Sequence, residues 1–133
     1  MDRRERLLRI LIVDDNRDAA DSLAMVVRAW GYDVRIAYDG AEGLAQATSF
    51  IPDVVLLDIG LPNLDGFQFA QQARTIEALQ QTRLISVSAY NDPQFLARLR
   101  ASGVDEHFPK PIRLLVLKRL LEEQQAALAP PPP

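Results

Sequence analysis

The sequence predicts an α/β domain in which a parallel sheet of five strands lies between two layers of helices. Five short apolar runs alternate along the chain with segments whose apolar residues recur at helical spacing. The segments that connect them are short, as they are in β/α units. With 133 residues, the chain is long enough to bury one core, so we expect a single domain without metal or disulfide support.

The first strand is predicted at residues 8–13, a compact apolar run that suits a strand buried on both faces. The helix after it has its apolar residues on one face and is expected to stop at Gly31. Residues 33–37 alternate polar and apolar side chains, as a strand nearer the sheet edge does. Asp39 and Glu42 resemble a capping box, so a second helix is expected to begin there.

The third strand is predicted at residues 54–57, the most apolar run of the chain, and belongs at the centre of the sheet. Asp65 and Gln68 repeat the capping pattern, before a helix that is expected to carry apolar residues as far as Ile76. A fourth strand is expected at residues 84–87.

The remaining elements are a helix, a short strand and a last helix. Asp92 lies before Pro93, and a capping acid followed by proline at the first helical position predicts a helix start. Gly103 is expected to end that helix. A fifth strand is then expected to run to about Phe108, and leucines at helical spacing from Leu114 onward predict the last helix.

Because crossovers between parallel strands are right-handed, few arrangements are open to five such units. We expect a flavodoxin-like, doubly wound (βα)5 sheet with strand order 2-1-3-4-5. The domain is expected to span residues 7–125. Residues 1–6 are expected to be a charged, solvated N-terminal segment. Residues 126–133, which end in four prolines, are expected to be an Ala/Pro-rich tail or linker that cannot extend the last helix.

Composition and charge argue against several classes of protein. The net charge of -3 and the pI near 5.1 argue against nucleic-acid binding through a broad basic surface. The chain has no cysteine and hence neither a disulfide nor a thiolate metal site. No apolar run approaches the ~18 residues of a membrane span, and the first residues lack the apolar stretch of a signal peptide. We therefore expect a cytoplasmic domain that binds neither nucleic acid nor membrane.

Chemically specific side chains follow the predicted strands. They are Asp14, Asp15, Asp58, Ser88 and Lys110. Because the carboxyl ends of parallel strands share one edge of a sheet, we expect these groups to meet in one acidic cleft. Two carboxylates ~4 Å apart repel by roughly 4 kcal/mol at an effective dielectric constant of 20, so three of them require a proton shift or a bound cation.

These residue types indicate phosphoryl transfer around a divalent cation. Hard oxygen ligands favour Mg²⁺, with Mn²⁺ as a possible substitute. The Lys110 ammonium suits a phosphoryl oxygen or a free carboxylate, and the Ser88 hydroxyl can donate to a phosphoryl oxygen. Taken singly, each residue has a simpler interpretation, since Asp15 or Asn16 could cap the first helix and Lys110 could be a solvated surface lysine.

Five stretches of the chain together resemble the receiver domain of two-component response regulators, over residues 7–122. They are Ile-Leu-Ile-Val-Asp-Asp-Asn at 10–16, Val-Val-Leu-Leu-Asp-Ile-Gly-Leu-Pro at 54–62, Asp-Gly at 65–66, Ser-Val-Ser-Ala at 86–89 and Lys-Pro at 110–111. The stretch at 59–62, together with His107, is similar to receivers attached to hybrid sensor histidine kinases.

The resemblance implies a role for each site residue. Asp58 matches the phosphoacceptor, whose carboxylate attacks a phosphohistidine of a sensor histidine kinase or histidine phosphotransfer protein. Asp15 matches a direct metal ligand and Asp14 a ligand that acts through water, while the backbone carbonyl of Gly60 matches the remaining protein ligand. Ser88 matches the hydroxyl residue that follows the phosphoryl group.

The resemblance also implies the rest of the switch and its partners. Lys110 matches the lysine that pairs with the phosphoryl group, and Pro111 the proline that typically follows a cis peptide bond. A downstream protein partner or a fused domain would read the changed surface. Such a domain is a signalling switch rather than a metabolic enzyme, and it is a monomer or a weak phosphorylation-dependent dimer.

The chain departs from the receiver pattern at two positions. Receivers commonly carry Tyr or Phe three positions before the lysine, where this chain has His107. Two interpretations stay open: a partly exposed ring on an edge strand, or a weakened or altered switch. Gly60 lies where receivers tune the lifetime of the phosphoryl group, and we expect slow to moderate self-hydrolysis because glycine has no side chain to guide a water.

Two other functions fit parts of the pattern. A phosphatase with an aspartyl-phosphate intermediate would share the acidic cleft, but that class wants a second acid two positions after the nucleophile, where Gly60 stands. A protein-interaction module that acts without phosphorylation would not need the complete acidic set.

Overall fold

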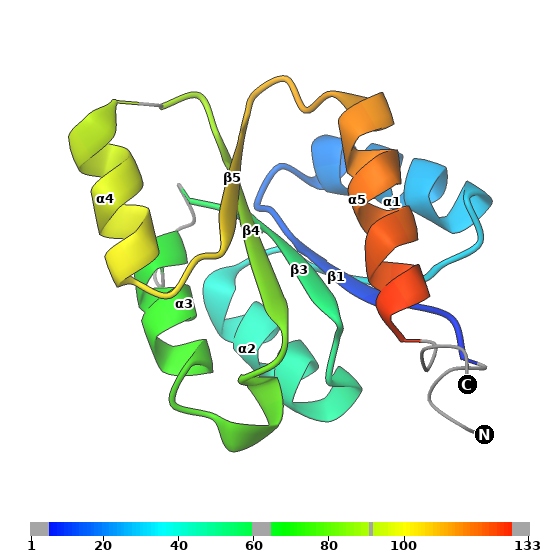
Figure 1. Cartoon of the computed structure of the whole chain (residues 1–133), viewed down its shortest axis with the longest axis horizontal. Helices are drawn as coiled ribbons and strands as arrows, with labels where there is room; N and C mark the ends of the chain where they lie inside the picture. The colour runs from blue at the N-terminus through cyan, green and yellow to red at the C-terminus, as the bar shows by residue number, and fades with distance from the viewer. Residues whose placement is uncertain (1–5, 60–64, 91, 129–133) are drawn as a thin grey trace.

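A computed structural model describes residues 6–59, 65–90 and 92–128 of the chain. Its five strands form one parallel sheet in the order β2-β1-β3-β4-β5, which confirms the expected doubly wound topology (Figure 1). The strands are β1 (Arg9–Val13), β2 (Asp33–Ala37), β3 (Val54–Asp58), β4 (Arg83–Ser88) and β5 (Glu106–Pro109).

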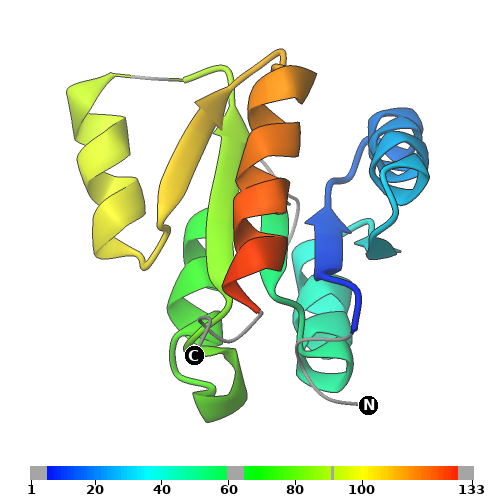
Figure 2. The same ribbon diagram turned by 45° about the vertical axis from the view of Figure 1, so that its right-hand side comes forward.

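Five α-helices cover the sheet on both faces. They are α1 (Arg17–Ala29), α2 (Gly40–Phe50), α3 (Gly66–Ala73), α4 (Pro93–Ala101) and α5 (Leu114–Ala127), with a short 3-10 helix, η2 (Glu77–Leu79), before β4. Helices α1 and α5 lie on one face, and α2, α3 and α4 lie on the other (Figures 1 and 2). None of the helices in the described ranges is long and apolar enough to cross a membrane.

The alternation of side chains along the strands produces two cores. Ile10 and Ile12 of β1 pack with buried residues of α1 and α5, while Leu11 and Val13 pack with buried residues of α2, α3 and α4. The apolar residues of β3 are at most 2% exposed, so this strand is the centre of the sheet as expected. Each fully buried side chain of this kind contributes roughly 1.5–3 kcal/mol, and the rigid sheet holds its carboxyl edge in place.

Four helices begin at a side-chain cap, given by Asn16, Asp39, Asp65 and Asp92. The capping box expected at Asp65 is complete, since the Gln68 side chain accepts from the Asp65 N–H. The box expected at Asp39 is only half formed. Asp39 accepts from the Glu42 N–H, but the Glu42 carboxylate accepts from the Tyr38 N–H instead.

Three sequence expectations were wrong: two concern where helices end, and one concerns the N-terminal segment. Helix α3 ends at Ala73, so Ile76 lies in the turn before η2. Helix α5 runs to Ala127, beyond the boundary expected at residue 125, because alanine favours helix and the first proline of the tail comes only at residue 130. Residues 129–133 lie outside the described ranges.

The third correction concerns Arg6, which was expected to be solvated. Its guanidinium donates to both oxygens of the Asp53 carboxylate at 2.7 and 2.9 Å, and the Arg9 N–H donates to the same carboxylate at 2.8 Å. The Gln125 side chain of α5 accepts from the Leu8 N–H and donates to the Arg6 carbonyl. The chain before β1 is therefore fixed to β3 and α5, at the end of the sheet away from the acidic residues.

Candidate functional site

Three carboxylates meet where β1 and β3 end. The register pairs Val13 with Leu57, so Asp14 and Asp58 leave their strands at the same level of the sheet. One oxygen each from Asp14, Asp15 and Asp58 lies within 4.8 Å of the others. This proximity arises from the parallel topology, because residues 44 positions apart come together only when both strands end at one edge.

The first helix does not use either acid of β1 as its cap. Asn16 is the N-cap of α1, and its side-chain oxygen accepts from the Ala19 N–H at 3.1 Å. Asp14 accepts from the Asn16 N–H at 3.0 Å, which orients its carboxylate at the start of the cleft. Of the two simpler interpretations of this segment, the structure selects Asn16 as the cap.

The electrostatics of the cleft are clearest at Asp14. The pKa of the Asp14 carboxyl is raised to about 6, mainly by burial and in addition by the nearby Asp58 carboxylate. The Asn16 N–H and the Lys110 ammonium act in the opposite direction without cancelling the rise. Without a cation, the cleft therefore favours a proton on Asp14 as the solvent approaches mildly acidic pH.

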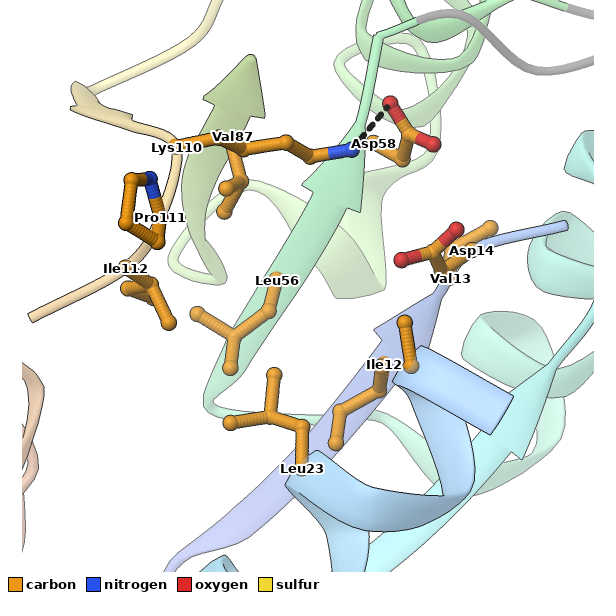
Figure 3. A pocket seen from close by; sticks show the side chains of 11 residues that line it. Ile12, Val13, Asp14, Leu23, Leu56, Asp58, Val87, Lys110, Pro111 and Ile112 are labelled. Carbon is orange, nitrogen blue, oxygen red and sulfur yellow. Dashed lines mark ion pairs between the residues drawn. The ribbon is translucent and has the colours of Figure 1, made fainter. Parts of the chain in front are cut away.

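Lys110 supplies the positive charge at the edge. Its Nζ lies 3.7 Å from Asp58 Oδ1, and Figure 3 shows the side chain reaching across the end of β4 toward this carboxylate. The Lys110 side chain is 44% exposed and that of Asp58 only 14%, so the Asp58 carboxylate is sheltered while Lys110 stays in contact with solvent. The Lys110 N–H donates to the Ser88 carbonyl, and the Lys110–Pro111 peptide bond is cis.

Ser88 ends β4 with its side chain buried. Its hydroxyl accepts from the Tyr90 N–H at 3.0 Å. Ser88 also lines a cavity of about 410 Å³ with Asp58, Lys110 and the α4 residue Arg98. No sequence pattern singles out Arg98, whose guanidinium lies 3.7 Å from the centre of the Phe67 ring.

A second cavity, of about 440 Å³, lies on the α1 and α5 side of the same edge. Asp58 and Lys110 line this cavity as well, and its floor is apolar, formed among others by Leu23, Leu56 and Ile112 (Figure 3). The Asp58 carboxylate therefore lies between two hollows whose walls are largely hydrophobic. Such walls weaken solvent screening and strengthen charge interactions at this carboxylate.

The start of α3 approaches the backbone at the end of β3 so closely that only glycine fits there. A Cβ atom on Gly66 would lie 2.5 Å from Ile59 Cδ1, 2.7 Å from Ile59 Cα and 3.2 Å from the Asp58 carbonyl oxygen. This contact explains the Asp-Gly pair at residues 65–66. Gly60, the position expected to supply a backbone carbonyl ligand, lies outside the described residues, so its role stays a prediction.

His107 lies on the edge strand β5 with its ring partly exposed, as one of the two interpretations expected, and two hydrogen bonds hold the ring. Its Nδ1 is 2.8 Å from Ser86 Oγ, and its Nε2 is 2.9 Å from the Tyr90 carbonyl oxygen. The ring also meets the Phe95 ring edge-on, with 5.7 Å between centroids. Sequence reasoning missed Ser86, although a serine inside an apolar strand, on the same face as Ser88, signals a buried polar partner.

The donor set fits a divalent cation. Three carboxylates within 4.8 Å of one another supply hard oxygen ligands. Lys110, which pairs with Asp58, stays 3.7 Å from that carboxylate and is partly solvated. Asp58, Ser88 and Lys110 surround one cavity, where a phosphoryl group could contact all three. This arrangement is suited to accepting a phosphoryl group on a carboxylate.

Comparisons with known proteins identify the family of the chain. Residues 10–122 match the family described as response regulator receiver domain. The chain is 38% identical over 111 residues to response regulator MprA of Mycobacterium avium, covering 80% of this chain and 46% of that protein. It is 35% identical over 103 residues to the DNA-binding dual master transcriptional regulator RpaA of Synechocystis, covering 77% of this chain and 43% of that protein.

The structure is similar to that of the chemotaxis protein CheY4 of Vibrio cholerae, with a TM-score of 0.83 and 26% identity over 88% of this chain and 98% of that one. The chain spans less than half the length of the two curated relatives. The family match covers most of the chain and contains every strand that forms the acidic edge. The chain belongs to the receiver domain family of response regulators.

Proposed function

We propose that this domain is a Mg²⁺-dependent phosphoacceptor switch in which Asp58 receives a phosphoryl group from a phosphohistidine. The donor would be a sensor histidine kinase or a histidine phosphotransfer protein. The observation that carries the proposal is the position of Asp58, which shares a metal-sized space with Asp14 and Asp15 and pairs with Lys110 at 3.7 Å. No other carboxylate among the described residues combines these features.

The chemistry follows from the residues at the edge. An Asp58 oxygen attacks phosphorus, the bond between phosphorus and the partner's imidazole nitrogen breaks, and the imidazole leaves with the electron pair. Lys110 is placed to neutralise charge on the phosphoryl oxygens, and the Ser88 hydroxyl is placed to donate to one of them. Asp14, Asp15, Asp58 and the Gly60 carbonyl would hold Mg²⁺, which supplies further positive charge at the transferred group.

The output is a change in binding surface rather than turnover of a metabolite. Phosphorylation adds charge at Asp58 and shifts the domain between two conformations, with a coupling of typically 1–3 kcal/mol. A downstream protein or a fused domain would bind one conformation more tightly. The similarity to a response regulator and to a DNA-binding regulator supports a role in signalling.

The test is phosphotransfer from a phosphorylated histidine protein in the presence of Mg²⁺, followed by mapping of the modified residue by mass spectrometry. We expect one phosphoryl group on Asp58, no transfer to Asp58→Asn, and loss of transfer when a chelator removes the ion. Asp53→Asn is a matched control, because Asp53 lies at the opposite end of β3 and pairs with Arg6. Label that persists in Asp58→Asn would refute the acceptor assignment, and steady turnover of a small phosphate ester would favour a phosphatase.

A further inference from the structure

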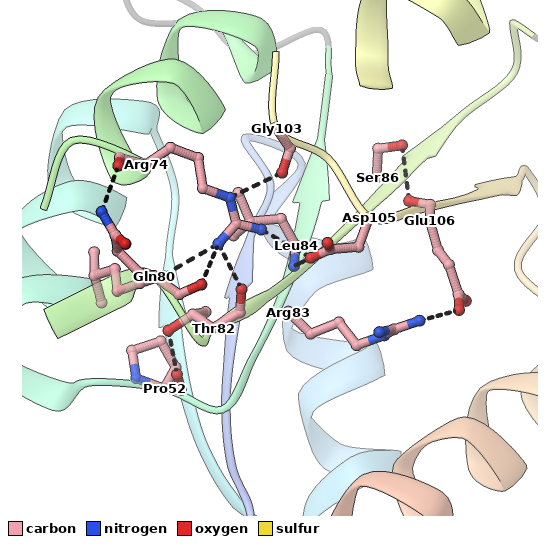
Figure 4. Close-up of polar contacts among 11 residues, drawn as sticks. Pro52, Arg74, Gln80, Thr82, Arg83, Leu84, Ser86, Gly103, Asp105 and Glu106 are labelled. Carbon is pink, nitrogen blue, oxygen red and sulfur yellow. Dashed lines mark hydrogen bonds and ion pairs between the residues drawn. The ribbon is translucent and has the colours of Figure 1, made fainter. Parts of the chain in front are cut away.

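Ser86 of β4 and His107 of β5 form a polar contact between these two neighbouring strands. The β4–β5 register sets these residues opposite each other, and Ser86 is completely buried. The Ser86 hydroxyl lies 2.8 Å from His107 Nδ1 but 3.4 Å from the Glu106 carbonyl oxygen, a contact that Figure 4 shows. A hydroxyl has one proton to donate, and the shorter contact takes it.

The other ring nitrogen fixes the tautomer. A backbone carbonyl can only accept, so His107 Nε2 carries the proton that it donates to the Tyr90 oxygen at 2.9 Å. In the neutral ring, Nδ1 is then the acceptor for Ser86. Phenylalanine could occupy the same space and keep the edge-on contact with Phe95, but it could make neither hydrogen bond.

Tyr90 connects this ring to the switch hydroxyl. Its N–H donates to Ser88 Oγ at 3.0 Å, while its carbonyl accepts from His107 at 2.9 Å. A continuous chain of hydrogen bonds therefore runs from Ser88 through the main chain of Tyr90 to His107 and ends on Ser86. A phosphoryl group on Asp58 would attract the Ser88 O–H as a donor, since Asp58 and Ser88 line one cavity. Any movement of Ser88 toward it strains or breaks the bond to Tyr90.

We propose that His107 and Ser86 are positioning residues that hold Tyr90, and through it Ser88, in the unphosphorylated arrangement. This proposal rests on the phosphoacceptor function above. In this proposal, the His107 ring keeps one fixed position in the resting state and is not free to swing. Activation releases Tyr90 and transmits the change to α4 through Phe95, whose ring contacts Tyr90, Phe67 and His107.

The energetic consequence is a resting state that is favoured by these bonds. If the conformation that binds a phosphoryl mimic is a minor population, removing a hydrogen bond that stabilises the resting conformation raises the apparent affinity for that mimic. One net hydrogen bond of ordinary strength corresponds to about a fivefold change in such an equilibrium. Beryllofluoride with Mg²⁺ is the probe, because it mimics the phosphoryl group on the acceptor.

The experiment compares beryllofluoride affinity, followed by amide NMR, in the parent protein, Ser86→Ala, His107→Phe and the double variant. We expect each single variant to bind about fivefold more tightly or better, and the double variant to match His107→Phe because Ser86 acts through the ring. Thr82→Val is the matched control, since Thr82 is also buried and donates to the Pro52 carbonyl at the other end of the sheet, and it should leave affinity unchanged.

The NMR chemical shifts of the His107 ring nitrogens give a second readout, which in the parent protein does not depend on the stability of any variant. The parent protein should show a proton on Nε2, and Ser86→Ala should shift Nδ1 most. Unchanged affinity in both single variants, fully additive effects, or a proton on Nδ1 in the resting protein would overturn the proposal while leaving the phosphoacceptor function intact. Failure of the parent protein to bind beryllofluoride with Mg²⁺ would overturn both.

Discussion

At the scale of single residues, Asp14 carries the electrostatic cost of the acidic edge. Its pKa rises to about 6, mainly because burial disfavours the charged form, and its neighbour Asp58 adds to the rise. An ordinary aspartate has a pKa of 3.8 in the unfolded chain. Between these two values the folded domain holds a proton that the unfolded chain has released.

The sign of the pH dependence follows from this difference. Stability rises as pH falls wherever the folded state binds more protons than the unfolded chain. In the absence of divalent cations, Asp14 therefore makes the domain more stable as pH drops through about 6. We expect the Tm of the parent protein to rise relative to that of Asp14→Asn between pH 7 and pH 5, as thermal melts in chelator would show. Parallel pH profiles for the two proteins would contradict the assignment.

The same titration opposes metal binding. A protonated Asp14 is a poor ligand, so the apparent affinity for Mg²⁺ should fall as pH decreases through about 6. Calorimetric titrations at several pH values would measure this fall. An affinity independent of pH would mean that Asp14 does not take part in holding the ion.

At the scale of elements, Arg74 joins the loops at the end of the sheet away from the acceptor. Its guanidinium donates to the carbonyls of Leu79, Thr82 and Gly103 and pairs with the Asp105 carboxylate at 2.8 Å (Figure 4). Gly103 permits this approach, because its φ is +102° and a Cβ there would lie 2.6 Å from Arg74 Cγ. One side chain thus ties the end of α3 to the starts of β4 and β5.

Removing this side chain's charge should therefore destabilise the fold without touching the site. We expect Arg74→Met to lower the free energy of unfolding by about 2–3 kcal/mol, because several carbonyls and a carboxylate lose a charged donor. Urea unfolding measures the loss. Arg100→Met is the control, because Arg100 is exposed and lines a surface hollow together with Arg74; this variant should stay within about 0.5 kcal/mol of the parent. Equal losses in the two variants would show that Arg74 has no special role.

Elements were predictable from sequence where local chemistry decides them. Apolar runs located β1, β3 and β4, and polar–apolar alternation located β2. Asp39, Asp65 and the Asp-Pro pair at 92–93 located three helix starts, while the cap of α1 stayed open between Asp15 and Asn16 until the structure selected Asn16. The site residues could be grouped by one topological rule, because parallel strands end at a common edge. The contacts of Arg74 and His107 could not be predicted, since they depend on which backbone groups the register of β4 and β5 brings alongside them.

At the scale of the whole molecule, the site exists only when the sheet is intact. The acidic residues, the hydroxyl and the ammonium come from the ends of β1, β3, β4 and β5, and two separate cores hold these strands in register. A ligand of this edge therefore binds the folded state alone. Mg²⁺ at 100 times its Kd should add about 2.7 kcal/mol to the free energy of unfolding, and much less in Asp58→Asn. Denaturant titration with and without the ion measures both values.

The most direct test of the central claim is fluorine NMR of beryllofluoride added to the domain with and without Mg²⁺. We expect bound fluorine signals only when Mg²⁺ is present and Asp58 is intact, because the acidic edge, the ion and the acceptor form one site. Bound signals in Asp58→Asn, or signals in the parent protein that persist after the ion is removed, would contradict it.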